Sequence, residues 1–168
     1  MPKSIIARVP VLEPGAKLPA LALSDERGAP VAPKEGETLY VVFKTTCPTS
    51  ALAWPDLERI ARVAEGGRLS VLGISQDDPE ETRAFEQRVG AAVPAAYDPP
   101  PWAASDALGV RTVPTFFRVA ADGTVAETVI GFDRARLEAL ARRAADLAGR
   151  PPAPLFRSDE HVPAIKPG

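Results

Sequence analysis

The chain has a single cysteine, Cys47, and its neighbours are typical of a reactive thiol. The segment 45–50 (TTCPTS) follows an apolar run and precedes a helical pattern. The first turn of a helix carries unpaired N–H groups and the positive end of the helix dipole, and both stabilise a thiolate, the nucleophilic form. Single cysteines are more often small buried apolar residues. Because this segment is polar and Pro48 suits a first helical turn, the sequence predicts a nucleophile at position 47.

Alternating strand and helix patterns surround this cysteine. Residues 38–43 (TLYVVF) are almost all apolar or β-branched, which is typical of a central strand buried on both faces. Ala121-Asp122-Gly123 is a hairpin turn signal between two short strand patterns. This order of elements predicts an α/β fold with a mixed central sheet and helices on both faces. The predicted strands are 38–43, 69–74, 93–97, 115–120 and 124–130. One predicted helix begins after Ser50, and three others cover 79–89, 102–108 and 132–147.

Composition excludes several classes of function. The 168 residues suit one domain with a short extra segment, and the net charge of −2 provides no basic field for a nucleic acid partner. No run approaches the roughly 20 apolar residues of a membrane span. One cysteine and one histidine exclude an intramolecular disulfide and a Cys/His zinc site, so we predict no metal and no cofactor. The first residues lack a signal-peptide pattern, which predicts a cytoplasmic protein, or a periplasmic or exported one if the start has been trimmed.

Prolines divide the chain near residue 149. Five of them, at positions 151, 152, 154, 163 and 167, lie beyond Gly149, where helical periodicity ends. We therefore predict one domain over residues 1–149 and a proline-rich tail over residues 150–168. The tail is too apolar for a free disordered end. We expect it to pack on the domain through Leu155, Phe156, Val162 and Ile165.

A second proline motif, Val113-Pro114-Thr115, stands before a predicted strand. A strand, a Cys-Pro at a helix start and a distant Val-Pro-Thr together resemble the thioredoxin fold, and more narrowly its TlpA-like and AhpC/TSA-type redoxin branch. The resemblance covers about residues 11–148. Residues 14–28 resemble the N-terminal β-hairpin of that branch, and residues 79–97 resemble its inserted helix–strand unit. The resemblance implies that Pro114 is cis, lies beside Cys47 and orients an extended substrate.

Departures from the family pattern bear directly on activity. Dithiol reductases of this fold use Cys-x-x-Cys, in which the second cysteine resolves a mixed disulfide; here that position is Ser50, which has no sulfur. Their buried acid corresponds to Val41, and peroxiredoxins have Pro and Thr where this chain has Tyr40 and Lys44. The resemblance implies a catalytic group of Cys47, Ser50 and Pro114, and a substrate groove formed by Thr46, Pro48, Trp54, Val113 and Arg111. The alternative for Trp54 is a core position, which is more usual for an aromatic residue on a helix.

Three functions agree with these residues. The first is a thiol-disulfide oxidoreductase for cell redox homeostasis, in which Cys47 attacks a protein disulfide or a glutathione-like adduct and an external thiol resolves it. Ser50 is then either natural or an engineered replacement of cysteine. The second is a one-Cys peroxidase of the antioxidant type, with Arg111 polarising the peroxide. The third is a non-catalytic binding module that keeps the groove. The sequence makes no prediction of oligomeric state.

Two further side chains are candidates for the rim of this site. An ammonium group at Lys44 would favour the thiolate if it approached the sulfur. The alternative is a solvated lysine at the edge of the sheet. Trp102 is expected either at the same rim or over a small core.

Overall fold

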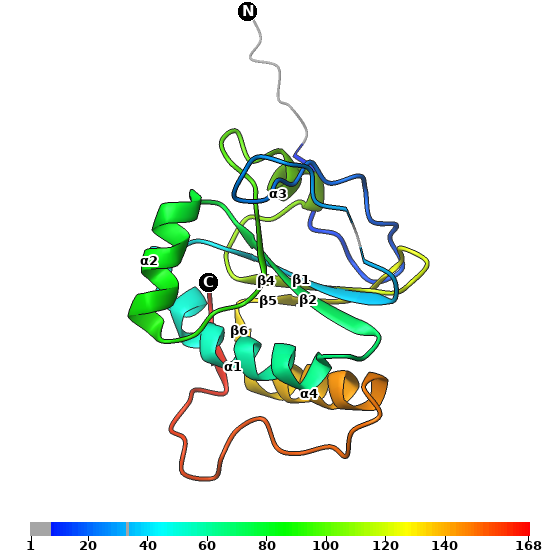
Figure 1. Cartoon of the computed structure of the whole chain (residues 1–168), viewed down its shortest axis with the longest axis vertical. Coiled ribbons are helices and arrows are strands. Elements are labelled where there is room, and N and C mark those ends of the chain that lie inside the picture. Colours follow the sequence, from blue (N-terminus) through cyan, green and yellow to red (C-terminus); the bar gives the residue numbers. More distant parts are fainter. Residues whose placement is uncertain (1–7, 33) are drawn as a thin grey trace, which may run out of the picture.

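The computed structural model describes residues 8–32 and 34–168, and a five-stranded sheet lies at its centre (Figure 1). β1 (Glu37–Phe43) is the middle strand, parallel to β2 (Leu69–Ser75) and antiparallel to β4 (Thr115–Val119). β3 (Ala95–Tyr97) extends the sheet beyond β2, and β5 (Val125–Ile130) extends it beyond β4. The strand order is therefore β3-β2-β1-β4-β5, which confirms the predicted mixed sheet.

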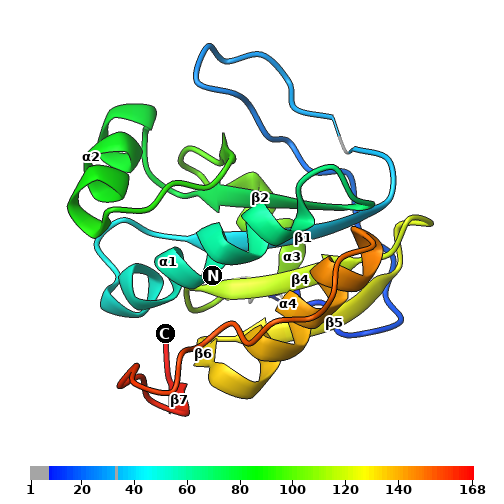
Figure 2. The same cartoon turned by 60° about the horizontal axis from the view of Figure 1, so that its bottom comes forward.

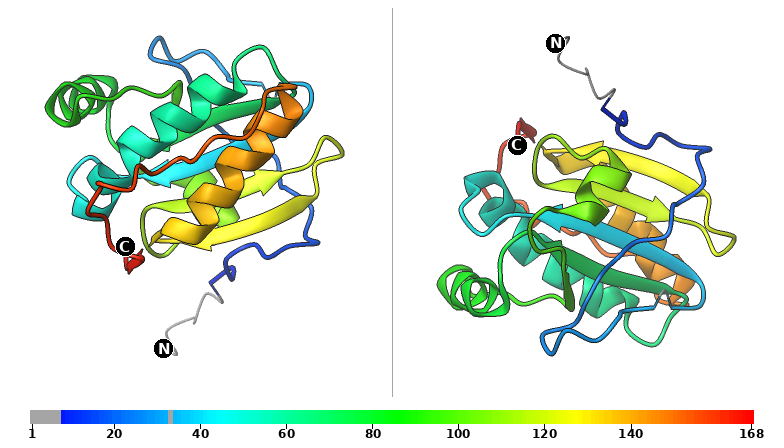
Figure 3. Two further views of the ribbon diagram at one scale, coloured as in Figure 1. Left: turned by 90° about the horizontal axis from the view of Figure 1, so that it is seen from below. Right: turned by 90° about the horizontal axis from the view of Figure 1, so that it is seen from above.

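Alternate side chains of β1 belong to two separate hydrophobic clusters, because successive residues of a strand point to opposite faces. The cluster that contains Val41 lies against α1 (Pro48–Ala64) and α4 (Arg134–Leu147). The cluster that contains Val42 lies against α3 (Ala103–Leu108) and the irregular segment before β1. Figure 3 shows these layers from below and from above. Helices on both faces of the sheet are confirmed.

The remaining helix, α2 (Pro79–Val89), lies beside α1 and has the predicted bounds. The Asp78 carboxylate accepts the Glu81 N–H at 2.8 Å, and the Glu81 carboxylate accepts the Asp78 N–H at 3.2 Å. These reciprocal bonds begin the helix. Gly90 ends it in the left-handed conformation, with φ of 70°.

The segment before β1 differs from the predicted N-terminal β-hairpin. It contains an isolated bridge between Ser24 and Pro30 instead of two paired strands. The Asp25 carboxylate accepts the N–H groups of Arg27 and Ala29, at 2.8 and 2.9 Å, so the turn itself uses these donors. Pro30 has no N–H with which to extend a ladder. The hairpin is therefore reduced to its turn and one bridge.

Residues 150–168 run from the end of α4 back toward the start of α1 (Figure 2). Leu155 and Phe156 are buried in the cluster formed by α1 and α4, and Val162 is partly buried against it. Ile165 is 69% exposed, so its expected role as an apolar anchor is wrong. The domain boundary at residue 149 stays a prediction.

Main-chain pairing replaces side-chain burial at the last part of this segment. Ile165 belongs to β7 (Ile165–Lys166), which pairs antiparallel with β6 (Phe132–Asp133). β6 directly precedes α4, so the pairing joins the tail to the start of that helix. Within the described part of the chain, no helix has the length and apolar character needed to cross a membrane.

Candidate functional site

Cys47 lies at the N-cap of α1, as the sequence predicts. Its backbone is extended, with φ of −86° and ψ of 118°, and Pro48 fills the first helical position. The Ser50 N–H points at the sulfur, with 3.4 Å between nitrogen and Sγ. This N–H and the positive end of α1 would stabilise a negative charge on Sγ. Cys47 is half-buried, so the residue keeps part of its surface in contact with solvent.

The second predicted motif meets the thiol from the side of β4. The Val113–Pro114 peptide bond is cis, as the resemblance implied. The Cys47 thiol donates to the Val113 carbonyl, with 3.1 Å between Sγ and oxygen. Because Val42 of β1 is opposite Thr115 of β4, the end of one strand and the start of the other lie at the same edge of the sheet. This register brings the two motifs together.

The loop that carries the cysteine is fastened to its neighbours through Thr45. The Asp77 carboxylate, just beyond β2, accepts the Thr45 N–H at 2.7 Å and its hydroxyl at 2.8 Å. The Arg88 guanidinium, on α2, donates to the Thr45 carbonyl at 2.9 Å. Thr45 is buried. Its three polar groups are therefore all bonded, which fixes the entry of the chain into α1.

Two side chains on α1 have buried polar atoms without a hydrogen-bond partner among the described residues, Ser50 through Oγ and Trp54 through Nε1. The Trp54 ring packs against Phe43 and Phe85, with centroids 4.0 and 5.4 Å away. Trp54 therefore belongs to the core, and the expectation that it lines a substrate groove is wrong. Ser50 is one helical turn from Cys47 and has no exposed surface.

Arg111 lies in a different environment from the one expected of a peroxide-binding group. Its guanidinium donates to the Val9 carbonyl at 2.8 Å and to the Val110 carbonyl at 3.4 Å. These bonds hold the segment before β1 against the loop before β4. The structure gives Arg111 this positioning contact in place of the expected one with Cys47.

The exposed rim beside the thiol contains Thr46 and Pro48, on either side of Cys47. The Lys44 ammonium lies over the Trp102 ring, 5.9 Å from its centroid, which is a cation–π contact. Lys44 is partly exposed just beyond β1, and this contact places its ammonium group on Trp102. Thr46, Pro48 and Val113 remain our candidates for substrate contact.

Comparison with known proteins assigns the family. A model of the AhpC/TSA family matches residues 14–128, a range that includes Cys47 and Pro114. The chain belongs to the AhpC/TSA family. Among curated proteins, none matches this AhpC/TSA-family chain.

Solved structures confirm that this AhpC/TSA-family chain has a thioredoxin-like fold. A candidate thiol:disulfide interchange protein DsbE from Chlorobium tepidum has a TM-score of 0.68 and 22% identity, covering 82% of this chain and 99% of that one. A candidate thioredoxin from Neisseria meningitidis has a TM-score of 0.64 and 24% identity, covering 77% and 90%. A peroxiredoxin-like protein from Aquifex aeolicus has a TM-score of 0.63 and 14% identity, covering 79% and 88%. At these identities the likeness shows the fold alone.

Sequence reasoning missed two side chains that position the thiol in this AhpC/TSA-family protein. Asp77 reads as one of several acids at a helix start, but its carboxylate binds Thr45. Its place directly after β2 was the available signal, because the ends of parallel neighbouring strands meet at one sheet edge. Arg88 gave no such signal, since only the tertiary packing of α2 brings it to the loop.

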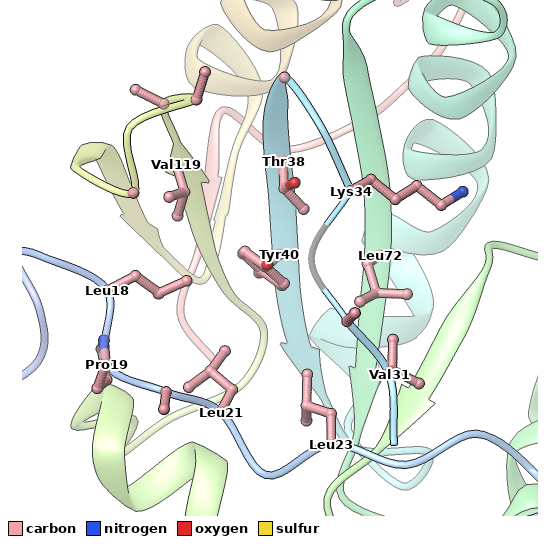
Figure 4. Close-up of a pocket in the computed structure, with 16 residues that line it drawn as sticks. Leu18, Pro19, Leu21, Leu23, Val31, Lys34, Thr38, Tyr40, Leu72 and Val119 are labelled. Carbon is pink, nitrogen blue, oxygen red and sulfur yellow. The ribbon is translucent and has the colours of Figure 1, made fainter. Parts of the chain in front are cut away.

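An apolar cavity of about 420 Å³ lies elsewhere in the structure, between the segment before β1 and the sheet (Figure 4). Leu18, Leu21 and Val31 line it from that segment, and Tyr40 and Leu72 line it from β1 and β2. Burial raises the pKa of the Tyr40 hydroxyl above its usual value. None of the predicted site residues lines this cavity. The cavity is therefore separate from the Cys47 site.

Proposed function

We propose that this AhpC/TSA-family chain is a monothiol thiol-disulfide oxidoreductase with Cys47 as its nucleophile. The placement of Sγ carries the proposal: it lies 3.4 Å from the Ser50 nitrogen and 3.1 Å from the Val113 carbonyl oxygen. The Val113 carbonyl accepts a hydrogen bond from the S–H of the resting thiol, and the Ser50 N–H donates one to the thiolate once the proton has left.

The proposed reaction has two exchange steps. The Cys47 thiolate attacks one sulfur of a disulfide, a new S–S bond forms, and the original S–S bond breaks. The leaving sulfur departs with the electron pair and takes a proton from solvent. An external thiolate, such as that of a glutathione-like thiol, then attacks the substrate sulfur of the mixed disulfide. A new S–S bond joins the external and substrate sulfurs, and Cys47 leaves as thiolate. The protein thus returns to its starting redox state.

The resolving thiol has to come from outside because Ser50 cannot form a disulfide. Its hydroxyl stands at the position of the second cysteine in the Cys-x-x-Cys pattern, and Cys47 is the only cysteine of the chain. The mixed disulfide should therefore accumulate when no second thiol is supplied. This holds whether Ser50 is natural or replaces a cysteine.

Intact mass measurement tests the proposal. Incubation with oxidised glutathione should give a single glutathione adduct, which reduced glutathione removes. Cys47→Ser should give no adduct, which is the control for attachment at this sulfur. A chain that stays unmodified would contradict the proposal and would favour the binding-module hypothesis.

A one-Cys peroxidase is the second candidate, and the AhpC/TSA family match favours it. In that reaction the Cys47 thiolate attacks one peroxide oxygen, the O–O bond breaks, and water leaves. One external thiol then converts the sulfenic acid to a mixed disulfide with loss of water, and a second releases Cys47 and leaves as a disulfide with the first. Against it, the Arg111 guanidinium is bonded to Val9 and Val110. We expect hydrogen peroxide to oxidise Cys47 more slowly than oxidised glutathione adds to it. The opposite order of rates would make the peroxidase the better description.

The proposed partners are a disulfide-containing protein and a small glutathione-like thiol. For cellular location, the sequence predicts the cytoplasm, whereas a secreted disulfide oxidoreductase from Mycobacterium tuberculosis shares the fold at 18% identity and a TM-score of 0.59, covering 74% of this chain and 94% of that one. Fractionation of cells that express the natural gene distinguishes the two locations.

A further inference from the structure

Residues 164–168, which we term the return segment, come back to the end of the molecule where α1 begins (Figure 2). Lys166 pairs with Phe132 in the β6–β7 ladder. The Arg134 N–H donates to the Ala164 carbonyl at 2.9 Å. Main-chain bonds therefore fix the path of the return segment.

The return segment contacts both sides of the thiol site. The Thr49 hydroxyl, in the first turn of α1, donates to the Pro167 carbonyl at 2.6 Å. A Cβ added to Gly168 would lie 2.3 Å from the Val113 carbonyl oxygen. The same oxygen accepts the Cys47 thiol at 3.1 Å. Gly168 and the Cys47 thiol therefore approach the same carbonyl oxygen.

The packing here leaves room only for backbone. A Cβ added to Gly131 would lie 2.7 Å from the Lys166 carbonyl oxygen and 3.2 Å from the Gly168 nitrogen. At both glycines the approach is closer than a real side chain tolerates. A foreign polypeptide that lies along Val113 to reach the thiol needs the same space, and a close-packed site cannot hold two chains.

We propose that the return segment occupies the polypeptide-binding surface beside Cys47. A protein disulfide must then displace the segment, whereas a small disulfide reaches Cys47 while the segment stays in place. The proposal rests on the proposed function of Cys47. Thr46 and Pro48 are exposed beside the half-buried thiol, which leaves an approach for a small molecule. The return segment thereby selects between the two classes of substrate.

Displacement does not require the rest of the tail to unfold. The β6–β7 ladder has two residue pairs, and Ile165 is exposed, so few contacts are lost. Leu155 and Phe156 anchor the earlier part of the tail separately. The return segment can therefore leave the site while the buried part of the tail stays in place.

Hydrogen exchange at the Arg134 amide tests displacement in the unaltered chain. Two mixed disulfides of Cys47 are prepared, one with glutathione and one with an insulin chain. In the glutathione adduct the Arg134 N–H should remain protected by Ala164. In the insulin adduct its exchange should become at least about tenfold faster, because that bond is broken in most molecules. Equal protection in both adducts would overturn the inference and leave the function of Cys47 intact. Failure of both disulfides to form an adduct would overturn the proposed function and the inference with it.

Gly168→Trp tests the same inference by kinetics, with Ser158→Trp as the matched control at an exposed position of the tail. A tryptophan cannot fit opposite the Val113 carbonyl, so it should expel the return segment. Capture of insulin should then be about tenfold faster, as expected when the competent fraction rises from about a tenth to nearly all molecules. The rate with oxidised glutathione should change less than about twofold, because that reaction does not need the segment to leave. Equal insulin rates for both variants would contradict the inference.

Discussion

The surroundings of Ser50 suit a thiol better than a hydroxyl. Its Oγ is buried and has no hydrogen-bond partner among the residues that the structure describes. A buried hydroxyl left without a partner costs about 1–3 kcal/mol. A thiol is a weaker donor and acceptor, so it loses less when it leaves water. Since Ser50 lies one turn from Cys47, a second sulfur at this position would also face the first.

Ser50→Cys should convert the chain into a dithiol reductase. We expect an internal disulfide with Cys47 under mild oxidation, and turnover of insulin disulfides without an external resolving thiol. Cys47 should remain the attacking sulfur, because it keeps the helix N-terminus. Val41 stands where dithiol enzymes have a buried acid, so resolution should be slow, with solvent taking the proton. Thiol titration and the insulin reduction rate measure both effects.

Ser50→Ala is the matched control for this substitution. It also removes the unpartnered hydroxyl, but it supplies no sulfur, so the chain should stay a monothiol. If Ser50→Cys forms no internal disulfide and behaves like Ser50→Ala, position 50 is not a resolving site.

One arginine of α1 contacts the tail at two points and also bonds within its own helix. The Arg59 guanidinium donates to Glu160 at 2.9 Å, to the Leu155 carbonyl at 3.2 Å and to Asp56 at 3.3 Å. Asp56 is buried, and this desolvation raises its pKa from 3.8 to about 6, although Arg59 opposes the shift. Glu160 is affected in the opposite direction, because its bond to Arg59 lowers its pKa. The contact between α1 and the tail therefore includes a carboxyl group, that of Asp56, whose ionisation is disfavoured by burial.

Asp56→Asn should make the protein more stable at neutral pH. A carboxyl whose pKa is raised in the folded state binds its proton more tightly there, so its contribution is favourable at low pH and is lost as pH rises from about 4 to 6. We expect the free energy of unfolding at pH 7.5 to increase by roughly 2 kcal/mol, and to change little at pH 4. Urea unfolding at both pH values measures this. The control Asp159→Asn removes an exposed charge from the tail and should show no such dependence.

Glu37 joins three elements, since it lies at the start of β1 and binds Arg118 of β4 and Arg143 of α4. Arg143 lowers the pKa of this carboxyl most, and Arg118 adds to the effect. The stabilisation is therefore present above pH 4.5 and disappears as pH falls through the lowered folded pKa. Glu37→Gln should reduce the free energy of unfolding by roughly 1–3 kcal/mol at pH 7. The difference from the unaltered chain should vanish in acid, and the exposed Glu13→Gln should have no effect at either pH.

The packing of the tail on the domain can be tested at Phe156. Its ring packs edge-on against Phe132, with centroids 6.2 Å apart, and the Arg134 guanidinium lies over it at 5.1 Å. Phe156→Ala should lower the free energy of unfolding by about 3 kcal/mol, as for other buried aromatic residues. Ile165→Ala, at an exposed position, should leave it unchanged within about 0.5 kcal/mol. Equal stability of the two variants would show that the tail is not part of the folded unit.

The sequence predicted the sheet, the helices and the contact between Cys47 and the Val113–Pro114 motif, because each depends on a local sequence pattern or on the order of the strands. Hydrophobic periodicity located the strands, and Pro48 indicated where the helix after Cys47 begins. The bond from Arg88 to Thr45 was not predictable, because it depends on how α2 packs against α1. Ile165 was misplaced for a related reason: an apolar residue signals burial, whereas main-chain pairing had already fixed this position.

The segment before β1 reaches both outer strands of the sheet, as the view from above in Figure 3 shows. At β5, the Gly15 N–H donates to the Val125 carbonyl and the Val125 N–H donates to Ala16, both at 2.8 Å. At β3, the Tyr97 N–H donates to the Ser24 carbonyl at 2.8 Å. An open sheet edge is a template for the strand of another molecule and a starting point for aggregation. One stretch, residues 15–24, occupies part of both edges here, so release of the whole stretch would expose two aggregation-prone strand edges at once.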